Sequence, residues 1–70
     1  MRQAVFGFAG TQSLALKLMN VFERHGASIV AITESPCKHD IDRFKVFGFV
    51  EEQSQADAIA KEIDKLRQGA

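Results

Sequence analysis

The sequence lacks features that are typical of secreted and membrane proteins. It has no tryptophan or tyrosine, and its one cysteine, Cys37, cannot form a disulfide within the chain. A chain without an internal disulfide fits a reducing compartment, so we expect a cytoplasmic protein. No apolar run approaches the ~18 residues of a membrane span, and the apolar part of the N-terminus is too short for a secretory signal. We therefore expect neither a membrane segment nor secretion.

The chain also lacks a net charge. Nine lysines and arginines balance nine aspartates and glutamates, so no overall field attracts nucleic acid, membranes or acidic substrates. Any nucleic-acid site must therefore depend on a local patch. Hydrophobic residues make up 46% of the 70 residues, which argues against disorder. The length predicts one domain with a core near the lower size limit, which a partner chain would help to stabilise.

Three β-prone runs and two amphipathic stripes predict the order strand, helix, strand, strand, helix. Thr11 or Ser13 can cap the first helix, and Gly26 stands where a left-handed residue ends one. Ser54 and Asp57 have the spacing of a capping box at the start of the second helix. The β-prone runs are residues 3–9, 27–33 and 43–51, the first stripe covers about 14–25, and a polar loop covers 34–42.

Each helical stripe has one apolar face, so both helices must share one face of the sheet in a two-layer α+β sandwich. A right-handed crossover places the first two strands parallel, with the third between them and antiparallel to both. The prediction is a ferredoxin-like fold of βαββα order, with residues 1–70 as a single domain that lacks the usual last strand. The first strand is then a free edge that invites another chain.

The third β-prone run, FKVFGFVEE, is apolar on both faces. If Phe47 and Phe49 face away from the helices, then Phe6 and Phe8 join them, with Lys45 at the border. An exposed apolar patch of this kind indicates an interaction surface. The alternative is that the phenylalanines face the helices and the valines face outward. In either case one apolar sheet face remains, and self-association would cover it.

The same run resembles the longer ribonucleoprotein motif of RNA-recognition-motif domains. The residues that fit are Lys45, Phe47, Gly48, Phe49 and Val50. The stretch VFGFAG is a looser match to the companion motif, with Phe6 in its aromatic place. The resemblance implies that bases of single-stranded RNA stack on Phe6, Phe47 and Phe49. The neutral chain and the acidic residues after the motif argue against it, so we rank nucleic acid behind a small ligand.

A second resemblance covers more of the chain. From Val5 to about Val50 the sequence is similar to the ACT domains that sense phenylalanine in prephenate dehydratases and aromatic amino-acid hydroxylases. The similarity is carried by LALKLMNVFERHGASIVAI, with Phe22, Gly26 and Ile29 at the family's spacing. The stretch TESPCK stands where the family has a Glu-Ser-Arg-Pro segment. The chain departs from the pattern in having QS where the family's loop has Pro-Gly, and in lacking the arginine and the last strand.

This resemblance implies an effector amino acid bound between two subunits. Glu34 would pair with the α-amino group, and amides at the start of the first helix would receive the carboxylate. By position, the ligand-binding residues are Gly10, Thr11, Gln12, Ser13 and Leu14 in the first loop, and Thr33, Glu34, Ser35 and Pro36 in the second segment. The aromatic residues Phe6, Phe8, Phe47 and Phe49, with Lys45, are then the subunit interface or an RNA surface.

The polar loop offers several potential metal ligands, which are Cys37, His39, Asp40 and Asp42. Zinc sites need four ligands, usually in paired spacings, and no second cluster accompanies these. Cys37 and His39 are also too close together on a loop to hold the geometry of a nucleophile and its base. We interpret the loop as a solvated turn, and we expect no metal, no cofactor and no catalytic residues.

These observations predict a small regulatory domain that binds an amino acid at a homodimer interface and is not an enzyme. Two alternatives stay open. One is single-stranded RNA binding through the aromatic residues, and the other is a protein-interaction module that uses the free edge of the first strand.

Overall fold

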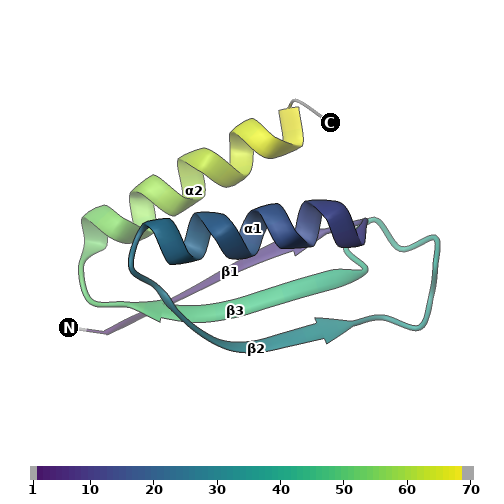
Figure 1. Ribbon diagram of the computed structural model, residues 1–70, viewed down its shortest axis with the longest axis horizontal. Coiled ribbons are helices and arrows are strands. Elements are labelled where there is room, and N and C mark those ends of the chain that lie inside the picture. Colours follow the sequence, from purple (N-terminus) through teal and green to yellow (C-terminus); the bar gives the residue numbers. More distant parts are fainter. Residues whose placement is uncertain (1, 69–70) are drawn as a thin grey trace.

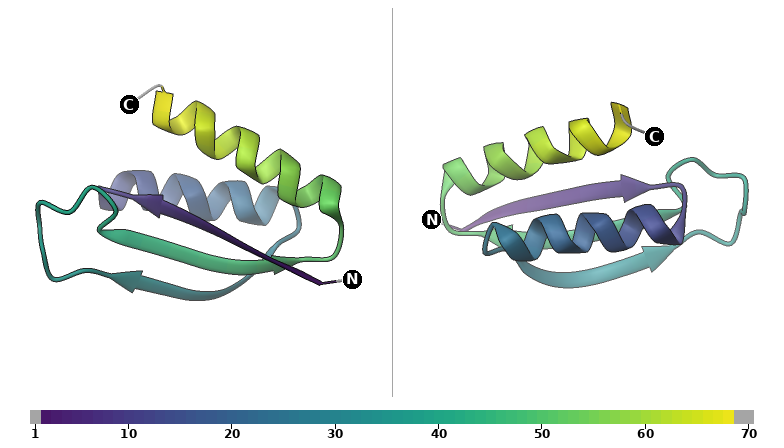
Figure 2. Two further views of the ribbon diagram at one scale, coloured as in Figure 1. Left: turned by 180° about the vertical axis from the view of Figure 1, so that it is seen from behind. Right: turned by 45° about the horizontal axis from the view of Figure 1, so that its top comes forward.

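The structure, a computed structural model that describes residues 2–68, is a two-layer α+β sandwich (Figure 1). Two helices lie on one face of a three-stranded antiparallel sheet, and Figure 2 shows from two further sides that they share this face. The predicted ferredoxin-like βαββα fold is therefore confirmed. The elements are β1 (Gln3–Ala9), α1 (Gln12–Arg24), β2 (Ser28–Glu34), β3 (Phe44–Val50) and α2 (Gln53–Gln68).

The strand order is β1-β3-β2, so β3 is central and both of its neighbours are edge strands. The register of β1 and β3 runs from Gln3 opposite Val50 to Ala9 opposite Phe44. On the other side, β2 pairs with β3 but shifts register between Ile29 and Ala31. Because β1 and β2 are both antiparallel to β3, they run parallel to each other, as a right-handed crossover requires.

Local residues set both ends of α1. Thr11 is the N-cap, and its side chain accepts a hydrogen bond from the Leu14 backbone N–H. The helix therefore starts at Gln12, two residues before the predicted stripe. At the other end Gly26 has φ +75°, and the Ala27 N–H donates to the Phe22 carbonyl. This is a Schellman ending, in which glycine adopts the left-handed conformation without strain.

The start of α2 differs from the sequence prediction, in which Ser54 was the cap. Ser54 lies inside the helix, and Gln55 forms the capping contacts instead. The Gln55 Oε1 accepts hydrogen bonds from the backbone N–H groups of Glu51 and Glu52, at 3.1 and 2.9 Å. This is the half of a capping box in which the third helical residue reaches back to the cap residue, here Glu52. The box therefore begins two residues earlier than predicted.

The core lies between the sheet and the helices. Phe22 and Leu18 of α1 and Ile59 of α2 pack on valines of the sheet, and Phe22 and Val46 are fully buried. Gly7 and Gly48 also face the helices, and this lets large helical side chains approach the backbone. A Cβ at Gly48 would stand 2.6 Å from the Ser28 carbonyl oxygen and 3.2 Å from Phe22.

In β1 and β3 the valines therefore face the helices, and Phe6, Phe8, Phe47 and Phe49 face outward. Phe44 is the exception, because it packs against the core. The alternative arrangement, with the phenylalanines in the core, is wrong. No helix covers the outer sheet face in the described part of the chain, as both views in Figure 2 show. Within residues 2–68, neither helix is long and apolar enough to cross a membrane.

Candidate functional site

The outer face of the sheet carries a continuous group of phenylalanines, which we name the aromatic sheet face. Phe6 lies opposite Phe47 in the β1–β3 register, and their ring centroids are 6.3 Å apart. Phe8 packs edge-on against Phe6 at 5.7 Å. Phe6 is 57% exposed, although it is one of the largest side chains in the chain. The members of the aromatic sheet face are Phe6, Phe8, Phe47 and Phe49, with Lys45 beside them.

Two cations border this face. The Lys45 ammonium lies 5.9 Å from the ring centre of Phe8, and the Arg2 guanidinium lies 4.9 Å from that of Phe49. Both distances are in the range of cation–π attraction. Arg2 is also 3.9 Å from Glu51, so its charge is partly offset. All five residues that the sequence singled out for this surface are thus brought together on one face.

The second feature is a groove at the C-terminal end of β1, which we name the Gly10 groove. Its volume is about 290 Å³. Gly10 is part of its lining, and a Cβ there would lie 2.9 Å from the Ile41 carbonyl oxygen. The loop before α1 and the loop before β3 therefore touch at a place where only glycine fits. The groove is lined by Phe8, Ala9, Gly10, Leu14, Ile41, Asp42 and Arg67.

The groove has one charge of each sign. Arg67, from the last turn of α2, places its Nη2 atom 3.3 Å from Asp42 Oδ1, and the same nitrogen donates to the Phe8 carbonyl at 3.4 Å. Both charged side chains are about half exposed, so a ligand can reach them. Leu14 and Ile41 supply apolar surface. The groove therefore combines a carboxylate, a guanidinium and an apolar wall at the N-terminal end of α1.

The sequence placed only part of this groove. Gly10 and Leu14 line it, and Thr11, Gln12 and Ser13 form the adjoining start of α1. Asp42 and Arg67 were not assigned to a ligand site. Arg67 could have been placed by topology, because α2 returns antiparallel to β3 and so brings its last turn to the end of β1.

The second predicted ligand segment lies at the opposite sheet edge. Ala9 of β1 and Glu34 of β2 both pair with Phe44, so two strand spacings, about 10 Å, separate them. Glu34 already forms an ion pair with Arg43, and the Ser35 N–H donates to the Arg43 carbonyl at 2.7 Å. Within one chain, Thr33, Glu34, Ser35 and Pro36 are thus apart from the Gly10 groove.

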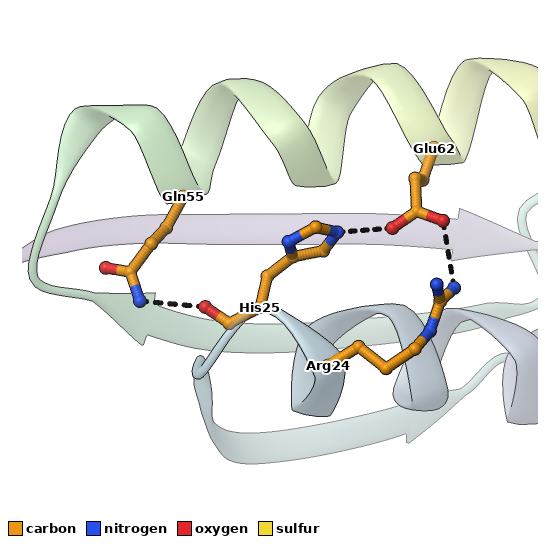
Figure 3. A network of polar contacts seen from close by, with 4 residues as sticks. All are labelled: Arg24, His25, Gln55 and Glu62. Carbon is orange, nitrogen blue, oxygen red and sulfur yellow. Dashed lines mark hydrogen bonds and ion pairs between the residues drawn. The ribbon is translucent and has the colours of Figure 1, made fainter.

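A polar cluster joins the two helices away from both features (Figure 3). Glu62 of α2 binds His25 Nε2 through one oxygen and Arg24 through the other, the latter at 2.9 Å. Gln55 donates to the His25 carbonyl at 2.8 Å. The hydrogen bond from His25, and to a lesser extent the Arg24 guanidinium, lower the pKa of Glu62. The cluster fastens α1 to α2 and faces neither the groove nor the aromatic face.

The polar loop between β2 and β3 is held by short-range hydrogen bonds. Ser35 Oγ accepts from the Cys37 N–H, and Asp40 Oδ1 accepts from the Asp42 N–H. Cys37 is a free, exposed thiol. Among residues 2–68 no three His, Cys, Asp or Glu side chains gather in a way that could hold a metal ion.

A scan against models of protein families, a search of curated proteins and a search of solved structures found no match for this chain. The functional proposal therefore depends on the fold, the groove and the aromatic sheet face.

Proposed function

We propose that the protein is a small regulatory domain that binds a free amino acid in the Gly10 groove and works as a homodimer. The observation that supports this most is the Asp42–Arg67 pair, 3.3 Å apart, beside an apolar wall. An amino acid has the complementary groups, which are an ammonium, a carboxylate and a side chain on one carbon. Few polar groups placed in a mostly apolar groove are typical of small-ligand sites.

Each group of the ligand has a partner in the groove. The Arg67 guanidinium binds the carboxylate through charge-assisted hydrogen bonds, and Asp42 accepts from the ammonium. The first backbone amides of α1, at Gln12 and Ser13, point out of the helix start and favour the negative end of the ligand. Leu14 and Ile41 contact the ligand side chain. In this proposal Asp42 takes the role that the sequence resemblance assigns to Glu34.

The apolar wall also sets the expected specificity. Ile41 is 82% exposed, and an apolar ligand side chain would cover part of it. Burial of apolar surface contributes about 25 cal/mol per Å². We therefore propose that amino acids with apolar or aromatic side chains bind more tightly than glycine or aspartate.

Thermal unfolding with each of the twenty amino acids tests the proposal. A ligand at 100 times its dissociation constant adds about 2.7 kcal/mol to the free energy of unfolding. We expect stabilisation by an apolar amino acid, and loss of that effect in Arg67→Ala but not in Lys65→Ala, which removes an exposed cation two residues away. No response to any of the twenty would contradict the proposal.

A second candidate function is single-stranded RNA binding on the aromatic sheet face. It is favoured by the exposure of Phe6 and by the cations at both borders, Lys45 near Phe8 and Arg2 near Phe49. Stacking of a base on an aromatic side chain contributes about 1–3 kcal/mol. Binding of short oligonucleotides should weaken with salt and be lost in a Phe47→Ala, Phe49→Ala double variant. Equal binding by that variant would exclude stacking.

A further inference from the structure

Within residues 2–68 no strand pairs with the outer edge of β1, which is therefore open to a partner strand. Arg67 donates to the Phe8 carbonyl, which shows that this carbonyl points away from β3. Backbone direction alternates along a strand, so the N–H and C=O groups of Ala4 and Phe6 point to the same free edge. The side chains offer no charge to prevent pairing, because none of the seven residues of β1 is charged.

We propose that a second copy of the chain adds to this edge, antiparallel to β1, about a two-fold axis at Phe6. This register pairs Ala4 with the partner's Phe8, and Val5 with the partner's Gly7. Each pair beside the axis sets a large side chain against a small one. The outward backbone groups of Ala4, Phe6 and Phe8 then meet the second copy in hydrogen-bonded pairs. The Phe8 carbonyl has two lone pairs, so it can accept from the partner as well as from Arg67.

The layer above the edge also fits a second copy. A groove of about 200 Å³ runs between β1 and α2, and every residue that lines it is apolar. Ala56 and Ala60 of α2 lie on its wall, so small side chains border the seam and allow the α2 helices of two copies to come close. The two three-stranded sheets would join into one sheet. The lining residues are Ala4, Val5, Phe6, Ala56, Ile59, Ala60 and Ile63.

The other free edge, on β2, is less suited to pairing. Its register shifts between Ile29 and Ala31, and bulges of this kind bend an edge strand away from partners. A two-fold axis at Ala31 would also set Val30 against the partner's Ile32, two branched side chains, and Ser28 against the partner's charged Glu34. The β1 edge has neither obstacle.

This pairing brings a residue of the partner to the Gly10 groove. Continuing the register past Gln3 places the partner's Arg2 opposite Gly10. Arg2 lies outside β1 and its side chain is exposed, and in the dimer its guanidinium would turn from Glu51 and Phe49 toward the groove. A second cation would then join Arg67 at the ligand carboxylate. This part of the inference rests on the proposed amino-acid site, whereas the dimer does not.

Two matched lysine substitutions test the dimer. Ala4 and Ala31 are both exposed alanines opposite a phenylalanine of β3, but they lie on different edge strands. Light scattering of the wild type at high micromolar concentration should give the mass of a dimer. We expect Ala4→Lys to be monomeric and Ala31→Lys to stay dimeric. A monomeric wild type, or a dimer disrupted by Ala31→Lys as much as by Ala4→Lys, would overturn the inference.

Oxidative cross-linking tests the axis. In a Cys37→Ser background, Phe6→Cys places a thiol on the proposed axis, where paired Cα atoms lie within the ~4.4–6.8 Å range of disulfides. We expect this variant to form a covalent dimer faster than the control, Ala31→Cys, which should stay reduced over the same time. Faster cross-linking by Ala31→Cys would assign the interface to β2 and refute the proposal.

The contribution of Arg2 is measured separately, with the amino acid that stabilises the wild type most. We expect Arg2→Gln to weaken its binding about tenfold, the size of one charge-assisted hydrogen bond, and to leave the dimer intact. Unchanged affinity in a dimeric Arg2→Gln would refute this contribution. A wild-type dimer that binds no amino acid would instead contradict the proposed function while the β1 interface stands.

Discussion

Arg67 Nη2, in the last turn of α2, lies 3.3 Å from Asp42 Oδ1, in the loop before β3, and the same nitrogen reaches the Phe8 carbonyl of β1. One guanidinium thus joins three parts of the chain at the end of the sheet. The exposed ion pair adds little stability, because such pairs contribute about 0–1 kcal/mol. Its position at the mouth of an apolar groove is what makes it a candidate for ligand recognition.

The first expected outcome concerns the two sheet faces. Val46→Ala should lower the free energy of unfolding by about 2 kcal/mol, because Val46 is fully buried under the helices. Phe6→Ala should cost less than about 1 kcal/mol, although it removes more atoms, because Phe6 is mostly exposed. Urea unfolding of a monomeric sample measures both. A larger loss for Phe6→Ala would contradict the assignment of the faces.

The second outcome concerns Gly48. A methyl group there would stand 2.6 Å from the Ser28 carbonyl oxygen, so Gly48→Ala must push β2 and β3 apart. We expect the free energy of unfolding to fall by about 1–3 kcal/mol, the usual cost of forcing extra volume into a packed site. Chemical unfolding measures it. A neutral or stabilising effect would show that the sheet is looser at this point than its geometry requires.

The third outcome concerns the start of α2. Gln55→Ala removes the hydrogen bonds that Gln55 accepts from the Glu51 and Glu52 backbone N–H groups and the one that it donates to the His25 carbonyl. We therefore expect the free energy of unfolding to fall by about 1–3 kcal/mol. Ser54→Ala, next to it, should change stability by less than about 0.5 kcal/mol. Thermal unfolding compares the two. A larger loss of stability for Ser54→Ala than for Gln55→Ala would show that Ser54 is the cap.

The fourth outcome is a pH dependence at Glu62. His25 and Arg24 lower its pKa below the ordinary value of 4.5, so the carboxylate stabilises the folded chain above that value. This contribution is lost as pH falls through the lowered pKa. The difference in melting temperature between wild type and Glu62→Gln should therefore be largest above pH 4.5 and shrink as the pH falls below it. A difference that does not change with pH would contradict the role of the cluster.

Local patterns in the sequence left open which face of the third strand packs on the helices, but they predicted the element order and the sheet order. These features follow from periodicity, from the left-handed turn at Gly26 and from the handedness of crossovers. The cap of α2 was predicted at the wrong residue. Ser54 and Gln55 can both reach the backbone N–H groups that have no partner within the helix, and only the angle at which the chain enters the helix decides between them. Spacing cannot resolve that angle.

The Gly10 groove was predicted only in part, for a different reason. Gly10 and Leu14 stand in a loop that the sequence can identify, whereas Asp42 and Arg67 are 25 residues apart and belong to a polar loop and a helix end. Their meeting depends on the length and tilt of α2 over the sheet. No local pattern reports these quantities, so charged residues at helix ends look like ordinary solvated surface.

Nuclear magnetic resonance tests the central claim, amino-acid binding in the Gly10 groove, most directly. Backbone amide shifts of labelled protein would be followed while the most stabilising amino acid is added. The account predicts that the largest changes occur at Gly10, Thr11 and Asp42, with small ones on the aromatic sheet face at Phe47. Shifts that concentrate at Phe47 and Phe49, or that are absent at saturating ligand, would contradict it.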